Sequence, residues 1–153
     1  MLLHYFGSKE ALIADVMELV QLRLQATFQK LLEQAGPKAG PHFLLQFWTA
    51  LAAKTNRPFL RLLFEVQMLA LQNPKRYRRY LTRTSTSWRR LIEQALPSRE
   101  KDAGAATTLY NSVIDGLLLE LLSTGDMART SRALKLFATR CAPQARPKLK
   151  GRK

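Results

Sequence analysis

The sequence is poor in cysteine, histidine and acid, with one cysteine, two histidines and 11 Asp and Glu among 153 residues. Because Cys141 stands alone, a disulfide within the chain and a Cys-x-x-Cys metal site are both excluded. This cysteine usage fits a reducing compartment, so we expect a cytoplasmic protein. We also expect that the protein holds no metal and no cofactor. No apolar run reaches the roughly 18 residues of a membrane-spanning helix, so we expect no membrane partner.

Residue patterns typical of enzymes are also missing. The two histidines, His4 and His42, lie at the start of the chain and near a predicted loop. No Ser/His/Asp arrangement, no pair of catalytic carboxylates and no glycine-rich phosphate loop is evident. We therefore expect that the chain is not an enzyme.

Signals for β-strands are nearly absent, whereas apolar residues recur at helical spacing throughout the chain. We predict an all-α fold, a bundle of about six helices. Capping residues and glycine or proline stops place the helix limits. The predicted helices begin near Ser8, Pro41, Asn56, Asn73, Ser98 or Asp102, and Asp126, and they end near Ala35, Lys54, Gln72, Leu96, Gly125 and Cys141.

Two of these helices are apolar on almost every side. The segments FLLQFWTALAA (43–53) and FLRLLFEVQMLAL (59–71) contain few charged residues. A helix of this kind is normally buried on all sides. We therefore expect both segments at the centre of the molecule, surrounded by the other helices.

The charge balance is strongly basic, with 25 Lys and Arg and a formal net charge of +14. Such an excess attracts polyanions. The basic residues cluster in two segments, one over 75–90 and one in the tail 143–153. A solvated helix face and a disordered tail explain this pattern, and direct contact with nucleic acid is the alternative.

The segment Leu2–Leu12, LLHYFGSKEAL, resembles the most recognisable stretch of the TetR/AcrR family of transcriptional regulators. The usual family form is Leu-Tyr-x-His-Phe-x-Ser-Lys-Glu-x-Leu. This chain keeps the leucines at both ends, the phenylalanine and the Ser-Lys-Glu run. It departs at Leu3, where tyrosine is usual, and at Tyr5, where histidine is common. The later segments PFLRLLFEVQMLALQNPKRYRRYL and VIDGLLLELLSTGD also resemble family helices, so the likeness covers roughly residues 1–141.

The resemblance implies an organisation in three parts. Residues 1–8 would be the remnant of a helix-turn-helix DNA-binding domain, 9–142 the regulatory and dimerisation domain, and 143–153 a basic disordered tail. In the family, residues matching His4, Tyr5 and Lys9 lie where the protein meets DNA. We expect the base-reading residues to precede Met1, so operator DNA would be a partner only of the full-length parent, and this chain alone would lack operator-specific binding.

Family members bind small molecules inside the regulatory domain, which implies a pocket for a small apolar or aromatic effector. Such pockets are mostly apolar with a few placed polar groups. The alternative is that these side chains are ordinary core. The candidate ligand-binding residues combine aromatic or soft side chains with polar groups inside apolar stretches, and they are Phe47, Trp48, Phe64, Glu65, Met68, Trp88, Tyr110 and Asn111.

The two final helices carry apolar stripes suited to a four-helix bundle across a dimer axis. Ordinary packing within the chain would produce the same stripes, and periodicity does not separate the two. The resemblance favours the homodimer. The candidate interface residues are Leu109, Val113, Gly116, Leu117, Glu120, Leu121, Leu134 and Phe137.

The sequence therefore leads to the effector-sensing and dimerisation domain of a TetR-type transcriptional regulator. Two other functions remain open. One is a standalone small-molecule-binding helical module. The other is a basic helical protein that binds nucleic acid or a membrane surface through its basic helix and tail.

Overall fold

A computed structural model describes residues 9–36, 41–95 and 102–141. Within these ranges the chain is all-α, as predicted, and contains six α-helices and no strand. The elements are α2 (Lys9–Ala35), α3 (Pro41–Leu51), the 3-10 turn η2 (Lys54–Asn56), α4 (Arg57–Gln72), α5 (Arg78–Ala95), α6 (Ala103–Thr124) and α7 (Met127–Cys141).

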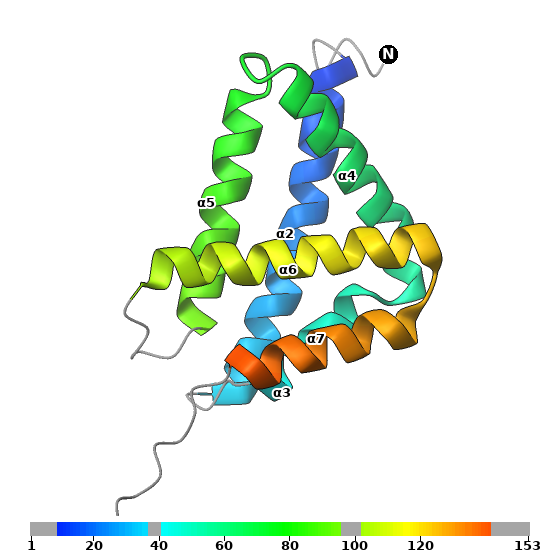
Figure 1. Cartoon of the computed structure of the whole chain (residues 1–153). Coiled ribbons are helices and arrows are strands. Elements are labelled where there is room, and N and C mark those ends of the chain that lie inside the picture. Colours follow the sequence, from blue (N-terminus) through cyan, green and yellow to red (C-terminus); the bar gives the residue numbers. More distant parts are fainter. Residues whose placement is uncertain (1–8, 37–40, 96–101, 142–153) are drawn as a thin grey trace, which may run out of the picture.

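Helices α2, α4 and α5 form a frame, and α6 and α7 run across it (Figure 1). Helix α2 contacts α3, α4 and α5, and α4 also contacts α5. Helix α6 crosses this frame and touches α5, α4 and α7, while α7 lies against α3. The turn between α4 and α5 lies at the same end of the molecule as the start of α2 (Figure 1).

Local capping signals set the limits of α6 and α7 as the sequence predicts. The Asp102 carboxylate accepts the amide of Ala105 at 2.9 Å, and the Asp126 carboxylate accepts the amide of Arg129 at 2.9 Å. Gly125 ends α6 in the left-handed region at φ +74°, which glycine adopts without a steric penalty.

The start of α5 differs from the prediction. The regular helix begins at Arg78 rather than near Asn73. The Asn73 carbonyl already accepts the amides of Arg76 and Tyr77, so a hydrogen-bonded turn precedes the helix. Helix α3 is likewise shorter than predicted, because it ends at Leu51 and η2 follows.

The main core joins α2, α3, α4, α6 and α7, with Trp48 at 1% exposure among its most buried side chains. A smaller core near the start of α2 groups Met17 with Val66, Ala70, Tyr77 and Tyr80. The prediction that α4 is buried on every side is wrong. Its residues Phe59, Met68 and Leu71 are exposed, because only one face of α4 lies against its neighbours.

Candidate functional site

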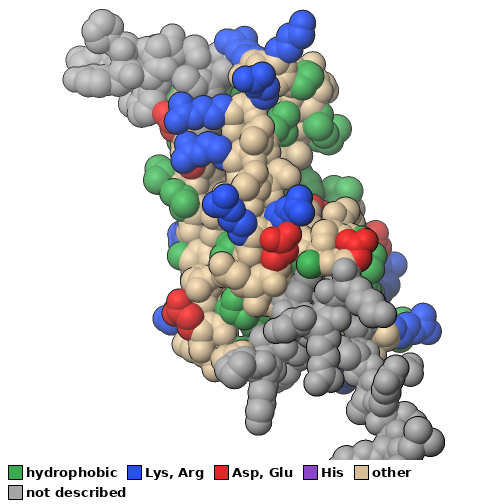
Figure 2. Space-filling view, turned by 90° about the vertical axis from the view of Figure 1, so that its left-hand side faces the viewer, with side chains coloured by type: hydrophobic (Ala, Val, Ile, Leu, Met, Phe, Trp, Pro, Cys, Tyr) green, Lys and Arg blue, Asp and Glu red, His purple; other side chains and the backbone are tan. Residues whose placement is uncertain are grey.

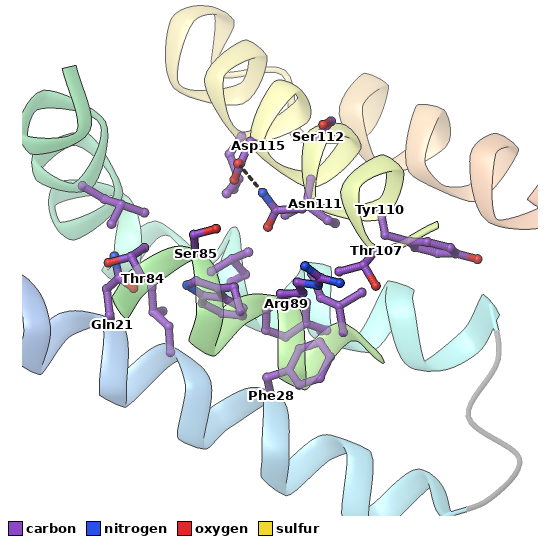
Figure 3. A pocket seen from close by; sticks show the side chains of 18 of the residues that line it. Gln21, Phe28, Thr84, Ser85, Arg89, Thr107, Tyr110, Asn111, Ser112 and Asp115 are labelled. Carbon is purple, nitrogen blue, oxygen red and sulfur yellow. Dashed lines mark hydrogen bonds between the residues drawn. The ribbon is translucent and has the colours of Figure 1, made fainter. Parts of the chain in front are cut away.

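A cavity of about 570 Å³ lies between α2, α4, α5 and α6, with α3 at its base. All six described helices contribute to its wall, with Ala138 as the contribution of α7, so its shape depends on how α6 and α7 pack on the other helices. Figure 3 shows polar side chains of α2 and α5 on one side and of α6 on the other. The lining includes Gln21, Leu24, Phe28, Phe43, Phe47, Leu60, Phe64, Gln67, Thr84, Ser85, Trp88, Arg89, Thr107, Tyr110, Asn111, Ser112, Asp115 and Leu118.

Aromatic rings build the apolar side of this cavity. The Phe28 ring makes edge-to-face contacts with Phe43 and Phe47, at centroid distances of 5.0 and 4.7 Å. The Trp88 ring lies 6.2 Å from both Phe28 and Phe47. Such arrangements are favourable beyond the area they bury, by about 0.5–1.5 kcal/mol per pair. The cluster joins α2, α3 and α5 and holds this wall in place.

Helix α6 contributes polar groups to the side of the cavity that faces α2 and α5. The Asn111 amide donates to the Asp115 carboxylate at 2.9 Å (Figure 3). The Arg89 guanidinium, at the edge of the cavity, pairs with Glu93 at 2.8 Å. Arg89 and Asp115 are the two charged groups on the described wall. Arg89 has a counter-charge, whereas no described cation forms an ion pair with Asp115.

The Asp115 carboxyl has an altered acidity. Burial among the cavity walls raises its pKa above the ordinary value, and the hydrogen bond from Asn111 opposes this rise. The residue as a whole remains exposed, because its carboxylate lies in a concave wall that opens to solvent. The protonated form is therefore favoured here more than at an open surface.

The structure brings five of the eight candidate ligand residues to the cavity wall, namely Phe47, Phe64, Trp88, Tyr110 and Asn111. It does not bring Trp48, Glu65 or Met68 there. The Trp48 indole is in the core, where its Nε1 donates to Ser131 Oγ at 2.9 Å. Glu65 and Met68 lie on the exposed face of α4. The expected placement of these three residues is therefore corrected.

Several wall residues were missed by sequence reasoning. Gln21 interrupts the apolar stripe of α2 between Met17 and Leu24, and its amide donates to the Tyr80 hydroxyl at 3.3 Å. Thr84 lies one helical turn before Trp88 on the same face. A polar residue within an apolar stripe was a usable signal for Gln21. Asp115 carried no such signal, because its position also fits a helix surface.

The candidate dimer residues divide into three groups. Leu109, Gly116 and Glu120 are exposed, although Glu120 pairs with Arg129 of the same chain. Val113, Leu117 and Phe137 are half-buried, and the Phe137 ring makes an edge-to-face contact with Tyr110 at 5.1 Å. Leu121 and Leu134 are 0% exposed in the core of one chain. The expected placement of these last two at an interface is corrected, because α6 and α7 bury them against their own chain.

An exposed seam runs along α6. Its members alternate at spacings of four and three residues. A Cβ atom at Gly116 would meet no neighbouring atom within 4 Å. Such spacing is typical of helices that associate side by side. The seam consists of Ala105, Leu109, Ser112, Gly116, Leu119 and Ser123.

The candidate DNA-contact residues fall at the edge of the described chain. His4 and Tyr5 lie outside the described residues. Lys9 is the first residue of α2, and its side chain is not among those described. Among the described residues there is no group of three His, Cys, Asp or Glu side chains that could hold a metal ion. Nor is any described helix both long and apolar enough to cross a membrane.

No protein-family model, curated protein or solved structure matches the chain.

Proposed function

We propose that this chain is the effector-sensing and dimerisation domain of a TetR-type transcriptional regulator. The observation that carries the proposal is the cavity between α2, α4, α5 and α6. It supports the expectation drawn from the LLHYFGSKEAL motif, which places a sensing domain after this segment. The last residues of the motif and one part of the cavity wall lie on the same helix, since α2 begins at Lys9 and its middle lines the cavity.

The effector we propose is a small molecule with an aromatic or apolar body and one polar group. The cavity volume of about 570 Å³ lies within the range of small-molecule sites, about 300–1,000 Å³. The rings of Phe28, Phe47 and Trp88 offer edges and faces to an apolar body. Asn111 and Asp115 offer a polar anchor on the opposite wall.

Helix α2 provides a direct route from the cavity to the amino-terminal end. It has 27 residues and is therefore about 40 Å long. Gln21, Leu24 and Phe28 line the cavity from its middle, and Lys9 begins the helix. A ligand that favours one position of α2 shifts the population of conformers, and in the full regulator this shift would move the DNA-reading heads.

The exposed seam of α6 supports the dimer. Leu109 and Leu119 are 50% and 54% exposed, which leaves two large apolar side chains on one helix face. Small residues between them, Ser112 and Gly116, permit close approach of a second helix. We propose that two copies meet along this seam.

Ligand binding is tested with the two tryptophans of the chain. Trp88 lines the cavity and Trp48 does not. We titrate the variants Trp48→Phe and Trp88→Phe with 1-naphthalenemethanol, a neutral aromatic probe, and follow tryptophan fluorescence. Saturable quenching should occur in Trp48→Phe, which retains the wall tryptophan, and should be weak in Trp88→Phe. Quenching of equal size in both variants, or no saturable quenching in either, would contradict the proposal.

Dimerisation is tested by sedimentation of two matched variants. Leu119→Glu places a charge on the α6 seam, and Leu22→Glu places one on α2 at a leucine of nearly equal exposure, 53% against 54%. The native chain and Leu22→Glu should sediment as dimers and Leu119→Glu as a monomer. A native monomer, or a Leu119→Glu dimer of unchanged affinity, would refute the seam.

A further inference from the structure

A basic face covers the turn between α4 and α5 and the outer side of α5. We define it by the exposed residues Lys75, Arg76, Arg78, Arg79, Thr82, Arg83, Thr86, Arg89 and Arg90. From Asn73 to Ala95 the only acidic residue is Glu93. Figure 2, which looks onto the side where α5 lies in Figure 1, shows Lys and Arg side chains gathered from the top of this face to its middle.

Several of these charges have no counter-charge among the described residues. Arg83 pairs with Glu18 at 2.7 Å and Arg89 with Glu93 at 2.8 Å. Lys75, Arg78, Arg79 and Arg90 form no ion pair among the described residues. A folded protein that holds unpaired like charges side by side is destabilised by their repulsion, and a polyanion would relieve it.

The face is linear. On a helix of 3.6 residues per turn, Arg79, Arg83 and Arg90 fall within about 40° of one another, and the rise from Arg79 to Arg90 is about 16 Å. Phosphates along one strand of duplex DNA rise by about 3.4 Å each, so this length matches about five of them. Thr82 and Thr86 lie beside the arginines and offer hydroxyl donors, which also bind phosphate oxygens.

We propose that this basic face binds the phosphate backbone of duplex DNA without regard to base sequence. A membrane surface fits less well, because binding to it also requires apolar side chains that enter the lipid, and no large apolar side chain of α5 is exposed. A single strand fits less well too, because its bases stack on exposed aromatic rings. The aromatic residues beside the face, Tyr77 and Tyr80, are buried.

Among the described residues this face shares Arg89 with the cavity wall and no residue with the α6 seam, and Arg78, Arg79 and Arg90 lie outside both. It would add nonspecific affinity at the end of the molecule where α2 begins, since the α4–α5 turn lies at that end (Figure 1). The two proposals therefore fail separately.

The test compares the full chain with two triple variants of equal charge loss. One removes Arg78, Arg79 and Arg90 from the basic face by substitution with Gln. The control replaces Arg132, Lys135 and Arg140 of α7 with Gln. These three exposed cations lie on a different helix and form no ion pair among the described residues. Circular dichroism first verifies that both variants fold. Because all three proteins keep the same carboxyl-terminal residues, a difference between the variants arises from the substituted helix.

Affinity for a fluorescein-labelled mixed-sequence DNA duplex is measured by anisotropy over a series of KCl concentrations. The native chain should bind it and a scrambled duplex equally well. Each phosphate contact contributes about −0.9 to the slope of log K against log salt. The slope of the α5 variant should therefore be less steep than the native slope by about 2–3, and its affinity for the duplex at low salt should fall at least about tenfold. The α7 control should keep most of the native slope.

Three outcomes of the measurements on DNA would overturn the proposal. They are an α5 variant with the native slope, an α7 control that loses as much as the α5 variant, and a native chain that prefers the single strand to the duplex. Binding of the native chain and the two variants to vesicles of phosphatidylcholine and phosphatidylserine is measured as well. Loss of vesicle binding in the α5 variant with unchanged duplex binding would assign the face to membranes and refute DNA.

Discussion

Phe28 lies where the core and the cavity wall meet, so its removal tests both at once. The side chain is 3% exposed and contacts the rings of Phe43 and Phe47 at 5.0 and 4.7 Å. Burying a phenylalanine side chain contributes about 1.5–3 kcal/mol, and the two close ring pairs add about 0.5–1.5 kcal/mol each. These contributions agree with the 3–5 kcal/mol or so that Phe→Ala substitutions cost in cores.

For Phe28→Ala we expect the lower part of this range, about 3 kcal/mol, since the space that it leaves merges with an existing cavity instead of forming a closed void. Urea unfolding followed by circular dichroism measures the change. With a slope of about 2 kcal/mol per molar urea, the midpoint should fall by about 1.5 M.

The matched control is Phe59→Ala, since Phe59 lies 41% exposed on α4 and outside the cavity wall. It should cost less than about 1 kcal/mol, as surface substitutions usually do. Phe28→Leu should lie between the two. If Phe28→Ala costs no more than Phe59→Ala, the aromatic cluster is not the support of the wall, and the reasoning fails.

Further predictions concern single groups. Tyr77→Phe should leave stability unchanged or raise it, because the buried Tyr77 hydroxyl has no partner among the described residues, whereas Tyr80→Phe should cost about 1 kcal/mol by removing a buried hydrogen bond; urea unfolding of both variants checks this. Gly125→Ala should destabilise by about 1 kcal/mol, since a side chain is strained at φ +74°, and Gly116→Ala should stabilise the monomer by about 1 kcal/mol in a helix interior with open Cβ space, while weakening self-association. A neutral probe that excludes water from Asp115 raises the pKa of this carboxyl further, so affinity for 1-naphthalenemethanol should fall as pH rises through that pKa. The variant Asp115→Asn should abolish this pH dependence. A probe affinity that rises with pH would contradict the assignment.

The fold was predictable to the extent that its determinants are local. Asp102, Gly125 and Asp126 act through bonds to residues three or four positions away, so a sequence pattern can reveal them. The start of α5 could not be predicted from the sequence, because the turn at Asn73 forms helical hydrogen bonds before the regular helix begins. Helix propensity does not distinguish a hydrogen-bonded turn from the first turn of a regular helix.

The site was less predictable because it depends on how helices cross. Phe47 and Trp48 are neighbours on α3 and are both buried, yet Phe47 faces the cavity and Trp48 faces Ser131 of α7. Met68 fits a buried helix by composition and is exposed because α4 is covered on one side only. Leu121 shows the same limit, since it belongs to the stripe that predicted a dimer contact and yet packs within its own chain.

We propose that ligand binding in the cavity changes the position of α2 within a dimer. The direct measurement is the distance between two copies of α2, recorded by pulsed electron paramagnetic resonance on a spin label at Asp15→Cys in a Cys141→Ser background. Asp15 is exposed near the amino-terminal end of α2. A saturating cavity ligand should shift this distance distribution. A ligand that binds and leaves the distribution unchanged, or the absence of any distance between copies, would contradict the proposal.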